Sequence, residues 1–160
     1  MGNIFSGSEI VEMAVQIEKN GRDFYNKMAV LSKNKDVKEI FEHLAGQEER
    51  HIRVFEDMLS AVKKYEPAEA YTDEYFSYMK ALADEHVFTK KEKGSEIAKK
   101  VKDEKHAIEL GIGFEKDSIL FYHEMENFVP ETERSIIENL LKEEQRHLKK
   151  LSLLKRRYYA

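Results

Sequence analysis

Two glutamate–histidine pairs in this 160-residue sequence have the spacing that a metal site on a helix requires. Glu48 precedes His51 by three residues, and Glu144 precedes His147 by the same interval. Residues three apart lie on the same side of a helix, one turn from each other, so the carboxylate and the imidazole can reach one metal ion. One such pair is a weak signal, because Asp and Glu together number 31 and the spacing also arises by chance.

An internal repeat makes chance a poor explanation for the two pairs. Leu44 followed by Glu48 and His51 returns as Leu140 followed by Glu144 and His147, at an offset of 96 residues. Upstream of each pair, Glu18-Lys19 with Phe24-Tyr25 returns as Glu115-Lys116 with Phe121-Tyr122, at an offset of 97 residues. The repeat predicts a single domain over residues 1–160, built from two similar helix pairs.

Apolar residues at steps of three and four positions predict four long helices and an all-α, four-helix bundle. The first helix is expected from Ser8 to Leu31, with Ser6 and Glu9 at the spacing of a capping box. The second opens with Asp36 as its cap and ends before Pro67. The third carries the stripe Ile108, Ile112, Ile119, Tyr122 and Met125. The fourth has Pro130 in its first turn and Lys155, Arg156 and Arg157 in its last.

The connection between the second and third helices is too long for a hairpin. It runs from Pro67 to about Val101 and predicts a crossover containing a short extra helix near Tyr75 and Met79. Within it, the stretch from Lys90 to Gly94 is expected to be exposed and mobile.

Six polar residues interrupt the apolar stripes of the four helices, and we predict that they bind metal. They are Glu18, Glu48, His51, Glu115, Glu144 and His147. Four unpaired carboxylates in a core would cost several kcal/mol each, whereas two divalent cations balance their charge and the imidazoles add nitrogen ligands. Glu48 and Glu144 are expected to bridge both metals. The alternative is that these glutamates lie on solvated helix faces and the histidines are ordinary core residues.

Other side chains are assigned lesser roles. The hydroxyls of Tyr25 and Tyr122 are suited to hydrogen-bond ligand carboxylates, although both residues also fit as core aromatics. The remaining histidines do not recur at the repeat offset and are expected at the surface or at helix ends: His43, His86, His106 and His123.

The sequence resembles the rubrerythrin-like branch of the ferritin-like superfamily over nearly its whole length. The resemblance rests on Ile17-Glu18, on Phe114-Glu115 through Phe121-Tyr122, and on the two Glu-x-x-His pairs. It implies a di-iron site that reacts with O₂ or hydrogen peroxide, with electrons often delivered by a rubredoxin domain. Ser118 departs from the pattern, because similar rubrerythrins carry an additional carboxylate at that position.

Composition restricts the partners that we expect. A net charge of −4 argues against nucleic acid or an anionic membrane surface, and no apolar run reaches the roughly 20 residues of a membrane helix. The absence of cysteine excludes thiolate metal sites from these residues and suits a reducing compartment, so a cytoplasmic location is expected. Met1 to Ser6 also match a short myristoylation pattern, to which we give little weight.

The leading functional hypothesis is a di-iron oxidoreductase that reacts with O₂ or peroxide and takes electrons from a separate donor protein. One alternative is a ferroxidase that handles iron, and another is a non-enzymatic bundle that metal merely stabilises. Manganese could replace iron, and zinc could occupy the site in a purified sample. A homodimer, with or without helix exchange through the crossover, remains an open alternative.

Overall fold

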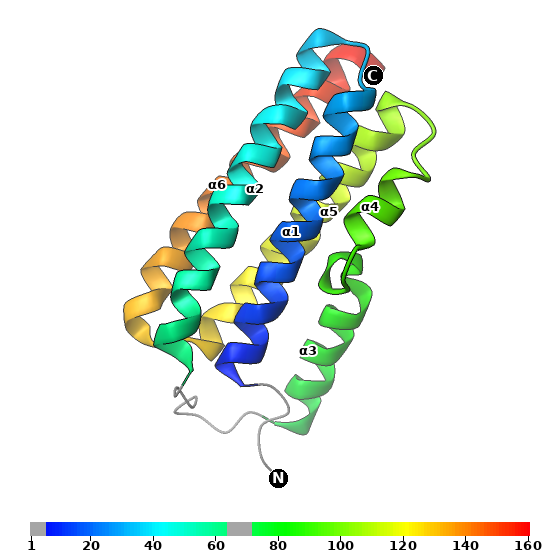
Figure 1. Cartoon of the computed structure of the whole chain (residues 1–160). Coiled ribbons are helices and arrows are strands. Elements are labelled where there is room, and N and C mark those ends of the chain that lie inside the picture. The colour runs from blue at the N-terminus through cyan, green and yellow to red at the C-terminus, as the bar shows by residue number, and fades with distance from the viewer. Residues whose placement is uncertain (1–5, 64–71) are drawn as a thin grey trace.

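The computed structural model describes residues 6–63 and 72–160, and within these ranges it contains helices and no strand. Four long helices form the bundle: α1 (Gly7–Leu31), α2 (Lys35–Val62), α5 (Glu104–Met125) and α6 (Glu131–Tyr159). Helix α1 packs along α2 and α5 packs along α6, and contacts of α1 with α5 and of α2 with α6 join the two pairs (Figure 1). The all-α bundle predicted from the apolar stripes is confirmed.

Local capping accounts for where the long helices begin. Ser6 and Glu9 form the predicted capping box, in which the Ser6 hydroxyl accepts from the Glu9 N–H at 3.2 Å. The prediction that Asp36 caps α2 is wrong, because the side chain of Asn34 accepts from the N–H groups of Asp36 and Val37. Asp36 lies instead in the first turn, where its charge faces the positive end of the helix dipole. Pro130 precedes α6 as its N-cap, one residue earlier than predicted.

The crossover carries two helices where the sequence predicted one. Helix α3 (Asp73–Glu85) contacts α5, and the 3₁₀ turn η1 (Val87–Thr89) and helix α4 (Lys93–Ala98) contact α1, so the connection spans the length of the bundle (Figure 1). A second 3₁₀ turn, η2 (Glu126–Phe128), leads from α5 toward α6. The crossover therefore returns the chain to the opposite end of the bundle before α5 begins.

Asn20 on α1 fixes the segment that the sequence predicted to be wholly exposed. Its side-chain amide donates to the carbonyls of Phe88 and Lys90, and its side-chain oxygen accepts from the N–H of Gly94. Lys90 is exposed as predicted, but Gly94 is buried, and a Cβ at Gly94 would overlap the backbone of Asn20. The expectation of exposure is thus wrong at Gly94, because α4 meets α1 backbone to backbone there.

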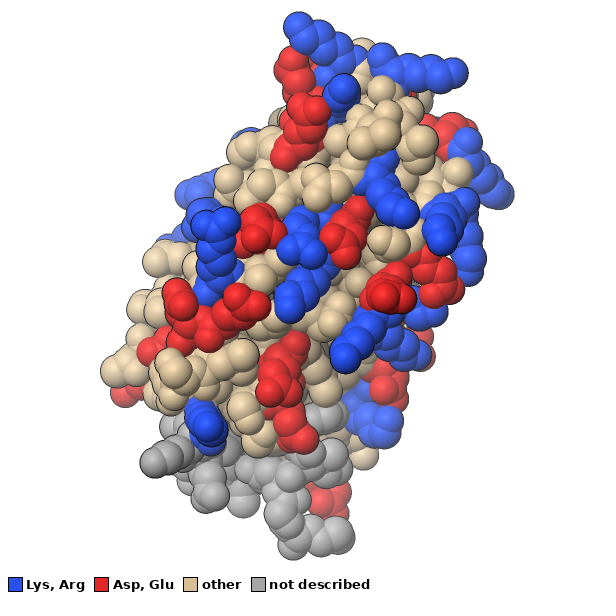
Figure 2. Space-filling view, viewed as in Figure 1, with Lys and Arg blue, Asp and Glu red and all other residues tan. Residues whose placement is uncertain are grey.

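Some predictions concern parts of the chain outside the described ranges. The start of the myristoylation pattern, residues 1–5, lies there, as does Pro67. Among the described residues, no helix is both long enough and apolar enough to cross a membrane. The face in Figure 2 carries cationic and anionic side chains interspersed over the bundle, with no large area of one sign.

Candidate metal centre

The four long helices bring the six predicted ligands together in the core. Helix α1 contributes Glu18 and α5 contributes Glu115, while α2 and α6 each contribute one Glu-x-x-His pair. Two overlapping groups result, and in each group one ligand atom per residue lies within 4.8 Å of the others: Glu18, Glu48, His51 and Glu144 in the first, and Glu48, Glu115, Glu144 and His147 in the second. Glu48 and Glu144 belong to both groups.

The two imidazoles direct the same ring nitrogen toward the carboxylates. Nδ1 of His51 lies 2.8 Å from Oε1 of Glu144 and 3.4 Å from Oε2 of Glu18. Nδ1 of His147 lies 3.5 Å from carboxylate oxygens of both Glu48 and Glu144, and 3.7 Å from Oε2 of Glu115. The rings stack with their centroids 5.6 Å apart. Each histidine therefore faces one of the two carboxylate groups.

Each of the six residues has one buried polar atom that makes no hydrogen bond of acceptable geometry with the residues described, although Nδ1 of each histidine lies within ion-pair distance of the carboxylates. These atoms are Oε2 of Glu18, Oε1 of Glu48, Nδ1 of His51, Oε2 of Glu115, Oε1 of Glu144 and Nδ1 of His147. Buried polar atoms are rarely left unpaired in folded proteins, since each costs about 1–3 kcal/mol. One unpaired atom per residue, all converging on one place, fits a site for two metal ions.

The pKa values of the clustered groups show that the carboxylates oppose one another's ionisation when no cation is bound. Burial, followed by the charges of Glu18 and Glu144, raises the pKa of Glu48 well above its ordinary value. Burial by itself would lower the pKa of His51, but the carboxylates of Glu18 and Glu144 outweigh it and raise that pKa to about 12. The His51 ring is thus protonated near pH 7 and balances part of the negative charge of the carboxylates.

Tyr25 and Tyr122 hydrogen-bond two of the clustered carboxylates across the bundle. The Tyr25 hydroxyl donates to Oε1 of Glu115 at 2.6 Å, and the Tyr122 hydroxyl donates to Oε1 of Glu18. Burial, together with the nearby carboxylate charges, raises the pKa of both phenols well above the usual 10. The phenols therefore stay protonated and remain donors, and each leaves the second oxygen of its glutamate free.

The sequence did not identify Glu143, which binds the outer nitrogen of His51. Oε2 of Glu143 lies 2.7 Å from Nε2 of His51, and Arg50 forms an ion pair with the same carboxylate. The repeat offers no signal for this residue, because its counterpart 96 positions earlier is Gln47. Gln47 accepts a hydrogen bond from Arg50 at 3.0 Å and, like Glu143, lines a surface hollow of about 260 Å³ beside His147.

His86 was predicted at the surface or a helix end, and it is a buried helix-end residue. It follows α3 as the C-cap and is only 1% exposed. Its Nε2 lies 3.3 Å from Oγ of Ser118, and its Nδ1 accepts from the Phe88 N–H. Burial lowers the pKa of His86 to about 4, so the ring is neutral near pH 7. No repeat signal could have found it, because it lies in the crossover.

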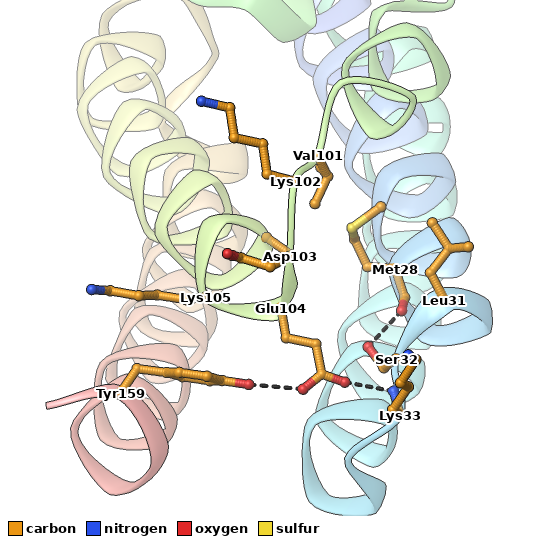
Figure 3. A pocket seen from close by; sticks show the side chains of 11 residues that line it. Met28, Leu31, Ser32, Lys33, Val101, Lys102, Asp103, Glu104, Lys105 and Tyr159 are labelled. Atoms are coloured by element: carbon orange, nitrogen blue, oxygen red, sulfur yellow. Dashed lines mark hydrogen bonds between the residues drawn. The ribbon is translucent and has the colours of Figure 1, made fainter.

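A larger hollow of about 620 Å³ lies away from the six residues, between the end of α1 and the start of α5 (Figure 3). Glu104 reaches across it, accepting from the Lys33 N–H at 2.5 Å and from the Tyr159 hydroxyl at 2.7 Å. None of the residues that line it has a buried side-chain polar atom without a hydrogen-bond partner. This hollow therefore lies between helix ends, whereas the six candidate metal ligands lie in the buried cluster.

The bundle and its buried carboxylate–imidazole cluster place the protein in the class of helical dimetal-carboxylate proteins. The family model described as Rubrerythrin matches residues 9–155, and the chain therefore belongs to the rubrerythrin family. The crystal structure of a Thermotoga maritima protein, assigned to the ferritin-like diiron-carboxylate proteins, is similar over 98% of this chain and 97% of that one. Its TM-score is 0.69 at 24% sequence identity, which confirms the fold. No curated protein matches the sequence.

Proposed function

We propose that this protein is a di-iron carboxylate oxidoreductase that reacts with O₂ or hydrogen peroxide. The observation that carries the proposal is the set of unpaired buried atoms, one on each of the six predicted ligands. Four carboxylates and two imidazoles suit iron or manganese, and membership of the rubrerythrin family favours iron. The proposed ligands are Glu18, Glu48, His51, Glu115, Glu144 and His147.

The two overlapping groups suggest how the ligands divide between the metals. Glu48 and Glu144 occur in both groups, so we assign them as bridges. Glu18 and His51 belong to the first group alone, and Glu115 and His147 to the second. Each metal would then have one terminal glutamate, one histidine and two shared carboxylates.

A bound pair of iron ions would supply the electrons that reduce O₂ or peroxide. The chain's own part is to hold the ligands in place and keep bulk water out. Tyr25 and Tyr122 fix the orientation of the terminal glutamates through their hydrogen bonds. Because the 160 residues contain no cysteine, a thiolate-bound iron centre is not among them, and electrons would come from a donor outside these residues.

An anaerobic Fe(II) titration of metal-free protein, followed by exposure to O₂ or peroxide, tests this function. We expect two irons per chain and a visible absorption band that appears on oxidation. Fewer than one bound iron, or two irons that never react, would contradict the proposal. Release of the oxidised iron, with uptake of many ions per chain, would identify iron as the substrate and support a ferroxidase instead.

A further inference from the structure

A small cavity borders the carboxylates on the side that neither histidine lines. Its walls include Glu48, Glu115 and Glu144 together with the apolar side chains of Ile17, Phe88 and Phe114. The space measures about 10 Å³, close to the room that one water-sized group needs. This cavity is therefore where a small ligand can approach the shared glutamates without meeting an imidazole.

The repeat places Gly21 and Ser118 at equivalent positions of this cavity. Gly21 follows Glu18 by three residues, and Ser118 follows Glu115 by three. Both residues line the cavity, and a Cβ on Gly21 would already lie 3.5 Å from Oε2 of Glu48. One helix thus leaves space beside the shared glutamates, whereas the other places a hydroxyl there.

Hydrogen bonding around His86 determines which way the Ser118 hydroxyl can donate. Because Nδ1 of His86 accepts from the Phe88 N–H at 3.3 Å, the ring proton belongs on Nε2. Nε2 then donates to Oγ of Ser118, also at 3.3 Å. The Ser118 hydroxyl has no acceptor of its own among the described residues, so its proton is free for a ligand. The other hydroxyl in the cavity wall, that of Tyr25, is already donated to Glu115.

We infer that Ser118 donates a hydrogen bond to one atom of a small ligand, O₂ or peroxide, that reaches into this cavity, and that His86 positions its hydroxyl. The inference rests on the proposed di-iron function and adds to it a residue that contacts the oxidant. A buried, neutral histidine with a fixed ring proton is a rigid support, because packing and the Phe88 N–H hold the ring in one orientation.

Azide binding to the oxidised, iron-loaded protein tests the role of Ser118. Azide is a small anion that can accept a hydrogen bond, and its affinity is read from the visible absorption of the metal pair rather than from turnover. In Ser118→Ala, we expect iron stoichiometry to stay at two per chain while azide affinity falls about tenfold, the effect of one lost hydrogen bond. Ser135→Ala, an exposed serine on α6, is the matched control and should bind azide like the wild type.

A double-mutant cycle tests whether His86 acts through Ser118. His86→Leu should weaken azide binding, and adding His86→Leu to Ser118→Ala should cause no further loss, because the hydroxyl that His86 positions is already gone. Unchanged azide affinity in Ser118→Ala with two irons bound would overturn this inference and leave the di-iron function intact. Failure of the wild-type protein to bind two irons would overturn both.

Discussion

Glu48 is an example of a proposed ligand that destabilises the folded protein when no metal is bound. Burial and the neighbouring carboxylates raise its pKa, so holding it ionised in the folded protein is unfavourable. For a carboxyl group whose folded pKa is raised, this penalty is present above the unfolded value near 4.5 and disappears as the pH falls below it. A residue can therefore be required for metal binding and still destabilise the protein that lacks metal.

We predict that Glu48→Gln stabilises the metal-free protein at pH 7 while abolishing paired metal binding. The gain should be about 1 to 3 kcal/mol, because the amide removes a buried charge at similar volume. Urea unfolding in the presence of a chelator measures it, and the gain should vanish below about pH 4.5. Glu49→Gln is the control, since Glu49 is only partly buried, pairs with Arg22 and belongs to neither ligand group. A destabilised Glu48→Gln would contradict our account of the site.

A second prediction concerns the tyrosines that orient the terminal glutamates. Tyr122→Phe and Tyr25→Phe should each weaken metal binding about 10- to 100-fold, the usual cost of losing a hydrogen bond to a ligand. Tyr122→Phe should weaken chiefly the metal held by Glu18, and Tyr25→Phe the metal held by Glu115. Competition with a chelator of known affinity measures both, and Tyr78→Phe on the surface should have no effect. If both variants bind metal with wild-type affinity, the tyrosines do not contribute to metal binding.

At the residue scale, the sequence could predict what the repeat duplicates. The six clustered residues and both tyrosines recur at one offset or the other, and all of them lie together in the structure. Glu143 and His86 have no such counterpart, so the sequence did not indicate their contacts. Their partners, His51 and Ser118, lie on other helices, and only the folded chain shows these contacts.

Among the elements, the start of α5 joins both helix pairs through one carboxylate. Glu104 accepts from the backbone N–H groups of Lys33 and Asn34 in the turn between α1 and α2, and from the Tyr159 hydroxyl near the end of α6 (Figure 3). Although burial opposes ionisation, these donors outweigh it and lower the pKa of Glu104. The stabilisation this gives is present above the ordinary pKa of 4.5 and is lost as the pH falls through the lower folded value.

We therefore predict that Glu104→Gln lowers the urea midpoint at pH 7 and that the difference from the wild type shrinks below pH 4.5. The amide keeps the size of the side chain, but it cannot accept three hydrogen bonds with the strength of a carboxylate. Glu12→Gln, at an exposed position of α1, provides the control for a general loss of negative charge. A constant difference at every pH would show that Glu104 acts through packing alone.

The contact between α4 and α1 leads to a prediction about two glycines. Gly94→Ala should destabilise the protein by about 1 to 3 kcal/mol, because its Cβ would overlap the backbone of Asn20 and push the crossover from α1. Gly46→Ala should stabilise it by up to about 1 kcal/mol, since that glycine lies inside α2 with nothing within 4 Å of an added Cβ. Urea unfolding of both variants tests these predictions. A Gly94→Ala variant as stable as the wild type would mean that α4 does not contact α1 at Gly94.

Sequence periodicity predicted where the long helices lie better than it predicted which of their residues are buried. On α5, Ile112 and Ile119 were assigned to the core stripe but are half-buried, while Gly111 and Ser118 are buried. Hydrophobicity alone misplaced this face because small residues occupy the positions nearest the cluster and the neighbouring helix. Gly111, for example, faces Tyr25 and Leu151, and a Cβ there would lie 3.1 Å from Leu151.

For the whole molecule, the two helix pairs of the repeat depend on each other at the candidate metal centre. Each ligand group draws residues from both pairs, and each tyrosine donates to a glutamate of the other pair. Neither helix pair alone could complete a group of ligands. A single domain remains a prediction from the repeat. It can be tested because each group of proposed ligands needs residues from both helix pairs.

If the chain is one cooperative domain, metal binding should stabilise both helix pairs equally. Free metal at about 100 times its dissociation constant adds roughly 2.7 kcal/mol to a protein that binds it only when folded. Hydrogen exchange measured by mass spectrometry should therefore show the same gain in protection for the slowest amides of α1 and α2 as for those of α5 and α6. Addition of chelator should reverse both gains. Glu48→Gln should show neither gain, although its substitution lies on α2 alone, because Glu48 is proposed to bind both metals. A gain confined to one pair would mean that the halves of the repeat unfold separately and that the single-domain prediction is wrong.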